Sequence, residues 1–274
     1  MLNYFPAIDI VLFFITLKLC NKIFENLYGV FAMKKLSLAT AVLASVFAMG
    51  ANAYQAEVGG SLGYIDAADG VTVVGVDGTY YFAPVQTKNG PLNEAAFLNR
   101  ASNIHGELSY DDLSEDTAVS AGVEYYVPNT DFYLSADLGT DGADTTTYAA
   151  EVGYLPASNF LVAVGIAGAD VDGGDNDSDP TLRAKYVTNL SGFDVNLEGG
   201  LVFGDDTAFN LGGDVYLDKT FSVGAGYADS GVDGADGVFS IRAKKFFTQQ
   251  ISVEGNINFV DDANSFGVRG AYRF

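Results

Sequence analysis

The sequence is poor in cysteine, tryptophan, proline and basic residues. It has one cysteine, Cys20, no tryptophan and six prolines in 274 residues. A lone thiol excludes a disulfide framework and a zinc site built from cysteines. Only 14 Lys and Arg stand against 35 Asp and Glu. This balance excludes a nucleic-acid binder, whose footprint would be a basic patch.

Long apolar runs are also missing beyond residue 53. No stretch there approaches the 18 residues that a membrane-spanning helix needs. The hydrophobic fraction is nevertheless 49% and the mean hydropathy is +0.17, which excludes a disordered acidic chain. With 32 Gly, 16 Tyr and 20 Phe, the composition favours strands and tight turns over helices.

The segment from Met33 to Ala53 has the layout of a Sec signal peptide. Lys34 and Lys35 precede an apolar run from Leu36 to Met49, and small residues lead to Ala53. We therefore expect a signal peptide at 33–53 and a mature chain at 54–274. The preceding residues, 1–32, are expected to be a spurious upstream extension, and the alternative is a real anchoring extension. Without residues 1–53 the chain keeps ten basic and 33 acidic residues, a net charge of −23, and no thiol.

The mature part alternates apolar with polar or small residues in segments of about ten. The clearest examples are residues 118–127, 193–201 and 251–259. Because side chains alternate between the two faces of a strand, each segment has one apolar and one polar face. Repeated segments of this kind, separated by turn residues, are typical of a transmembrane β-barrel.

Fourteen such segments can be counted, and an even number suits a bacterial single-chain barrel. They start near Tyr54, Val71, Asn103, Ala118, Asp131, Thr146, Phe160, Thr181, Phe193, Ala208, Phe221, Val238, Ile251 and Asn264. The patterns near Val71 and Phe160 are uneven, so twelve strands is the alternative count. A soluble β-sandwich would alternate too. The apolar face, however, is almost free of charge, with Lys245 near a strand end as an exception, and this favours the membrane barrel.

The connections between the segments differ in character. Every odd-numbered connection is acidic, and together they hold twenty Asp and Glu and no Lys or Arg. The even-numbered ones are mostly minimal turns, such as those at 128–130, 156–158 and 218–220. If both termini face the periplasm, the acidic set is extracellular.

One even-numbered connection, residues 83–102, is much longer than a turn. Asn89-Gly90-Pro91 signals a turn, and Leu92 to Ala101 is predicted as a short helix. It is either a packed periplasmic loop or a segment that folds into the barrel mouth and narrows it.

The last segment ends in an aromatic pattern. Tyr272 and the terminal Phe274 follow apolar residues at further even offsets. This resembles the C-terminal signal that the barrel-assembly machinery of Gram-negative bacteria reads.

Two adjacent motifs carry a closer resemblance. Gly78-Thr79-Tyr80-Tyr81-Phe82 and, soon after, Gly90-Pro91-Leu92-Asn93-Glu94-Ala95-Ala96-Phe97-Leu98-Asn99 resemble the general porins of gammaproteobacteria, of the Acinetobacter outer-membrane type. The resemblance implies an outer-membrane barrel in contact with lipids, with a water-filled channel for small hydrophilic solutes. It implies no cofactor and no catalytic residues, and it leaves the oligomeric state open.

Charged residues at lumen-facing positions are the candidate pore lining. Acids lie on the first six segments and bases mostly near the end of the chain: Glu57, Asp77, Glu107, Glu124, Asp137 and Glu151 against Arg183, Lys185, Arg242, Lys244, Arg269 and Arg273. One hypothesis is that the two arcs face each other across the lumen and set up a transverse field. The alternative is that the bases neutralise neighbouring acids. With Asp194, Glu198, Asp214 and Glu254 added, ten acids against six bases predict a mild cation preference.

Two further features are candidate sites. The acidic stretch 169–180 lacks the EF-hand spacing, so no firm metal site is predicted. Its carboxylates are candidates for weak divalent-cation binding: Asp170, Asp172, Asp175, Asp177 and Asp179. The only histidine, His105, has Ser102 and Ser109 nearby in sequence, yet no nucleophile elbow or second histidine accompanies it. His105 is therefore expected to line the lumen.

The sequence thus predicts an all-β transmembrane barrel that acts as a passive channel and not as an enzyme. The alternative function is a non-conducting surface protein whose acidic outer loops bind cations or host ligands. A lipid hydrolase of the outer membrane lacks a recognisable catalytic set.

Overall fold

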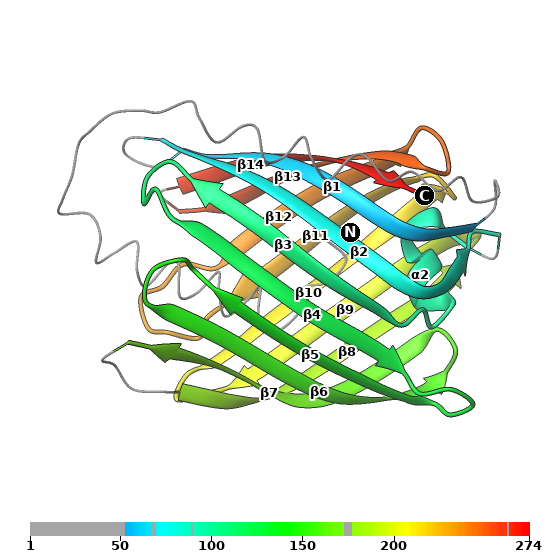
Figure 1. The fold of residues 1–274 in the computed structure, drawn as a ribbon, viewed down its shortest axis with the longest axis horizontal. Helices are drawn as coiled ribbons and strands as arrows, with labels where there is room; N and C mark the ends of the chain where they lie inside the picture. The colour runs from blue at the N-terminus through cyan, green and yellow to red at the C-terminus, as the bar shows by residue number, and fades with distance from the viewer. Residues whose placement is uncertain (1–52, 67–69, 89, 173–176, 262) are drawn as a thin grey trace.

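The computed structural model describes residues 53–66, 70–88, 90–172, 177–261 and 263–274. They form one closed antiparallel barrel in which each strand pairs with the next and β1 pairs with β14 (Figure 1). The strands are β1 (Ala53–Asp66), β2 (Val71–Gln86), β3 (Asn103–Asp111), β4 (Thr117–Tyr126), β5 (Phe132–Thr140), β6 (Thr145–Ala157), β7 (Phe160–Val171), β8 (Asp177–Leu190), β9 (Phe193–Phe203), β10 (Thr207–Asp218), β11 (Phe221–Asp229), β12 (Val238–Phe246), β13 (Ile251–Val260) and β14 (Ala263–Arg273). The signal peptide and the upstream extension predicted at 1–53 lie almost wholly outside the described residues.

The strand count of fourteen is confirmed, and all strands but one begin within one residue of the predicted start. The exception is β8, which begins at Asp177 and not near Thr181. Its first residues continue the ladder with β7, for example Ala167 opposite Asp179. Near the end of a barrel both faces of a strand meet water, so pairing extends past the point where alternation stops.

The two faces of the barrel differ as the alternation predicts. Large apolar side chains point outward and are exposed, with Leu138 at 63% and Leu211 at 65%. Cross-strand aromatic contacts, such as Phe132 with Tyr154 at 5.7 Å between ring centroids, join neighbouring strands. Most inward positions hold polar, charged or small residues, apart from large apolar side chains near one end, such as Leu155, Leu161 and Phe246. An apolar exterior around a polar interior is the reverse of a soluble protein.

The predicted helix forms inside the connection after β2, but it is shorter than expected. It consists of a 3₁₀ turn, η2 (Leu92–Glu94), and α2 (Ala95–Leu98). The prediction that it reaches Ala101 was wrong. Arg100 adopts a left-handed backbone conformation with φ of 49°, and the Ala101 N–H donates to the Ala96 carbonyl at 3.0 Å, which closes the helix end. No helix in the described ranges is long and apolar enough to cross a membrane.

The two ends of the barrel are unlike. One end, here the turn end, carries both termini of the barrel strands and the even-numbered connections, several of them two residues long. The connection between β8 and β9 is Ser191-Gly192, and both residues have positive φ, at 54° and 94°, as a tight hairpin turn requires. The other end, here the loop end, carries the acidic odd-numbered connections.

Candidate functional site

The interior of the barrel is lined differently in its two halves. Toward the loop end, the inward positions are mostly small and polar: Ser61, Gly63, Gly75, Ser109, Ser120, Gly139, Ala167, Gly200, Asn210, Gly212, Gly226, Ser240, Asn256, Asn258, Ser265 and Gly267. These short side chains project little into a barrel of this strand number.

At the turn end, residues 87–88 and 90–102 enter the barrel and form a plug (Figure 1). Asn99 closes the base of the plug. Its side-chain amide donates to the Gln86 carbonyl at 2.8 Å and the Ala95 carbonyl at 2.6 Å, and its oxygen accepts from the Gln86 N–H at 3.3 Å. This geometry supports the interpretation of the connection as a segment folded into the barrel mouth.

Polar contacts tie the plug to three separated strands. The Glu94 carboxylate lies 2.9 Å from Lys185 Nζ on β8 and accepts from the Tyr216 hydroxyl on β10 at 2.5 Å. The Leu92 carbonyl accepts from Arg273 Nη1 on β14 at 2.9 Å. Glu94, Lys185 and Arg273 are each at most 2% exposed, so these charges are held away from solvent.

Apolar contacts hold the plug against the remaining wall. Phe97 packs in a cluster with residues from β4 to β8: Tyr126, Tyr133, Leu155, Leu161 and Val187. Ala95 and Ala101 pack with residues of β1 and β2: Tyr54, Tyr81 and Val85. Together with the polar contacts, the plug therefore touches strands around most of the circumference.

The effect of the plug is visible in the burial of the wall. On every strand an inward residue near the turn end is less than 9% exposed: Tyr54, Tyr81, Asn103, Tyr126, Tyr133, Leu155, Leu161, Val187, Asn196, Tyr216, Ser222, Phe246, Ser252 and Arg273. The plug covers several of these side chains through its two apolar clusters. Inward residues farther from the plug, such as Thr147 and Ala167, are buried as well, so the plug narrows the turn end without being the only cause of burial.

Above the plug, charged side chains form a belt around the wall. Each of the six predicted pore-lining bases lies beside an acid: Arg183 by Glu151 at 2.6 Å, Lys185 by Glu198 at 3.1 Å, Arg242 by Asp214 at 2.7 Å, Lys244 by Glu254 at 3.1 Å, Arg269 by Glu57 at 3.1 Å and by Asp77, and Arg273 by Glu57 at 2.5 Å. Each pair lies on adjacent strands or two strands apart. The geometry thus favours local neutralisation over the hypothesis of two arcs that face each other across the lumen.

Glycine is what lets pairs form across an intervening strand. Arg242 on β12 reaches Asp214 on β10 over Gly224, where an added Cβ would lie 2.2 Å from an Asp214 oxygen. Gly122 has the same role on β4 between β3 and β5, since its Cβ would lie 1.9 Å from Asp137 Oδ1. These glycines shape the belt, and alternation alone gave no sign of them.

Four lumen acids form no ion pair with Lys or Arg in the described part of the chain: Asp194, which accepts from the Asn189 amide, and then Glu107, Glu124 and Asp137, here the acid arc. The acid arc lies on β3, β4 and β5. Glu124 is buried by the plug and accepts from the Tyr133 hydroxyl at 2.6 Å. Asp137 lies 3.0 Å from His105 Nε2. The acid arc leaves one side of the lumen with uncompensated negative charge.

The other predicted sites can be placed as well. Ser102 accepts from the Tyr126 N–H at 2.9 Å and has no contact with His105 among the hydrogen bonds of the described residues. In the acidic stretch, Asp179 lies within β8, whereas Asp175 lies outside the described residues. No group of three His, Cys, Asp or Glu among residues that the structure describes is placed to hold a metal ion.

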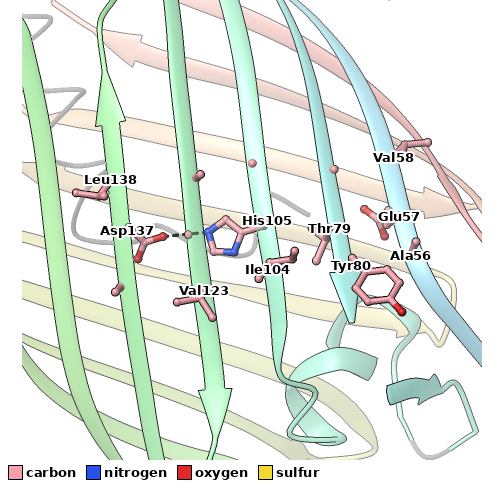
Figure 2. Close-up of a pocket in the computed structure, with 15 residues that line it drawn as sticks. Ala56, Glu57, Val58, Thr79, Tyr80, Ile104, His105, Val123, Asp137 and Leu138 are labelled. Atoms are coloured by element: carbon pink, nitrogen blue, oxygen red, sulfur yellow. Dashed lines mark hydrogen bonds and ion pairs between the residues drawn. The ribbon is translucent and has the colours of Figure 1, made fainter. Parts of the chain in front are cut away.

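A hollow of about 710 Å³ runs along the wall over β1 to β5 (Figure 2). Its large apolar lining residues, Tyr80, Ile104 and Leu138, are among the exposed side chains of the outer face. The hollow is therefore a groove of the barrel exterior.

Sequence reasoning missed Glu94, Asn99 and Tyr216, which hold the plug in place. Glu94 and Asn99 lie within the motif at 90–99, and that motif is the one signal that marked them. Tyr216 follows the ordinary alternation of its strand and carries no separate signal.

Comparison with known proteins adds family information. The family described as "Putative general bacterial porin" matches residues 33–177, just over half of the chain. The outer membrane protein Omp33 of Acinetobacter baumannii is 32% identical, with a TM-score of 0.73, over 82% of this chain and 100% of that chain. A KdgM porin is 14% identical with a TM-score of 0.47, covering 80% and 99%, and Pseudomonas putida OprB is 8% identical with a TM-score of 0.45, covering 82% and 93%. No curated protein matches the chain.

Proposed function

The chain belongs to the general bacterial porin family and is a porin of the Gram-negative outer membrane, and from this premise we propose how it transports solutes. We propose that small hydrophilic solutes and cations diffuse passively through the lumen and that the plug sets the access to it. The single observation that carries this proposal is the mostly small and polar inward lining of the loop-end half of the barrel, with the plug held in the turn end. Family and fold indicate a channel rather than an enzyme.

Orientation follows from the two unlike ends. We place the turn end in the periplasm and the loop end outside, because outer-membrane barrels have short periplasmic turns and longer extracellular loops. In this orientation the acidic connections face the medium, and the plug is a periplasmic structure. Tyr272 stacks on Phe274 at 6.0 Å at the periplasmic edge, where we propose that the assembly machinery reads them.

Solutes are proposed to diffuse through the lumen without binding at a specific site. Its loop-end half is lined by small polar residues, which offer hydrogen bonds to water and to many solutes but select none of them. The plug narrows the turn end, so a solute passes there when the plug moves aside. The alternative function, a non-conducting surface protein, is not favoured by the family or the fold.

Charge selectivity tests this proposal. All six lumen bases are paired, whereas the acid arc is not, so we expect a mild cation preference in a salt gradient across a planar bilayer. Glu107→Gln removes one uncompensated charge and should lower the ratio of cation to anion permeability. Asp218→Asn is the matched control, because Asp218 is an exposed acid at a turn, outside the lumen, and should leave the ratio unchanged. A reversal potential of the anion-selective sign would contradict the proposal.

A further inference from the structure

The only histidine of the chain is held in a defined place inside the lumen. His105 lies on β3, its side chain is 33% exposed, and its Nε2 is 3.0 Å from Asp137 Oδ1 on β5 (Figure 2). Between them, Gly122 of β4 is in register with both residues. A Cβ at Gly122 would lie 2.5 Å from His105 Nε2, so any larger residue would separate the pair.

The second ring nitrogen also faces an oxygen. His105 Nδ1 lies 3.2 Å from Asn103 Oδ1. The Asn103 amide nitrogen donates to Glu124 Oε2 at 2.8 Å and to the Ala101 carbonyl at 3.3 Å, which turns its oxygen toward the ring. A neutral imidazole has one N–H, whereas the imidazolium has two. Only the protonated ring can therefore donate to both Asp137 and Asn103.

The charged neighbours of His105 come from three strands. On its own strand Glu107 follows two residues later, and Glu124 lies buried on β4. On β2, Thr79 is opposite His105 in the ladder, and Asp77 beyond it is occupied by Arg269. No Lys or Arg of the described chain pairs with the acid arc. His105 lies beside the acid arc, and histidine is the side chain that ordinarily gains a positive charge between pH 5 and 8.

We propose that His105 determines the charge selectivity of the lumen, through its pairing with Asp137 over Gly122. With the ring neutral, Glu107 and Asp137 both attract cations. With the ring protonated, the charge of Asp137 is offset and the cation preference falls. This inference rests on the proposed channel function.

Reversal potentials between pH 5.5 and 8 test it on protein purified from outer membranes. The ratio of cation to anion permeability of the wild type should rise about twofold with pH, because the charge of Asp137 is then no longer offset and adds to that of Glu107. His105→Gln should give a flat ratio at the high-pH value. Glu107→Gln should lower the ratio at every pH and keep the rise. A flat wild-type profile, or the same rise in His105→Gln, would overturn the inference, whereas absence of current at every pH would overturn the channel function itself.

A second measurement does not depend on the folding of a variant. Diethyl pyrocarbonate acylates imidazole, and this chain has a single histidine. Treating the folded wild-type protein should abolish the pH response, and hydroxylamine should restore it. Persistence of the pH response after acylation of His105, verified by mass spectrometry, would overturn the inference.

Discussion

Replacing the helical part of the plug, Leu92–Leu98, with a Gly-Ser stretch of equal length should raise the single-channel conductance several-fold. The replacement removes Glu94, which joins the plug to Lys185 and Tyr216, and Phe97, which fills the space against β4 to β8. Ordering each residue of the segment costs about 1–2 kcal/mol of conformational entropy. Without these contacts nothing offsets that cost, so the segment is expected to leave its place in the lumen. Single-channel recording in planar bilayers measures the effect.

A matched control makes the same change in chain flexibility at a different place in the barrel. The connection 230–237 between β11 and β12 lies at the loop end, and the same Gly-Ser replacement there should leave the conductance nearly unchanged. The account would be wrong if the plug variant formed a heat-modifiable, folded barrel with the conductance of the wild type.

Lys185→Met should be the most destabilising single substitution of the lumen. Lys185 is 2% exposed and lies 2.9 Å from Glu94 and 3.1 Å from Glu198. Removing one partner from a buried ion pair leaves uncompensated charge and costs about 3–5 kcal/mol. We expect a loss of this size in the free energy of unfolding, measured by denaturant titration in lipid vesicles, and longer channel openings as the plug loosens.

Two control variants test whether the loss of stability comes from the contacts of Lys185 or would follow from removing any lysine. Lys245→Met removes a lysine that is 41% exposed and pairs with an exposed Asp218 at 3.5 Å, so its cost should be about 0–1 kcal/mol. Adding Glu94→Gln to Lys185→Met should recover part of the stability, because one of the two orphaned charges is then neutral. Equal destabilisation by Lys185→Met and Lys245→Met would contradict the role of Lys185 in anchoring the plug.

The strands could be predicted from the sequence because every strand of a membrane barrel has one face toward lipid and one toward the lumen. Apolar and polar side chains therefore alternate along it with a period of two residues. In β4, Val119, Ala121 and Val123 face outward and Ser120, Gly122 and Glu124 face the lumen, as the alternation predicts. The early start of β8 could not be predicted in this way. Near its start the strand leaves the region where one face must be apolar, so only backbone pairing marks it.

The ion pairs of the lumen required the register as well as the faces. Glu57 and Arg273 are 216 residues apart in sequence, yet closure of the barrel makes β1 and β14 neighbours and sets them opposite each other. Arg242 and Asp214 lie two strands apart and meet because Gly224 leaves room. A charge tally treats these groups as free, and for this reason it suggested separate arcs.

The plug was the hardest part to predict. A helix was predicted over residues 92–101 and forms over 92–98, but whether it lies inside or outside the barrel depends on partners far away in sequence. The partner of Glu94, Lys185, was identified only as a lumen base, and Tyr216 had no distinguishing pattern. Tertiary contacts, not local propensity, decide where a helix of this length lies.

Planar-bilayer recording of the wild-type protein, expressed from the full sequence and purified from outer membranes, tests the central claim most directly. The account predicts reproducible conductance steps, with closed periods when the plug fills the turn end and a reversal potential of the cation-selective sign. A folded, heat-modifiable barrel that conducts no ions under any condition would contradict it.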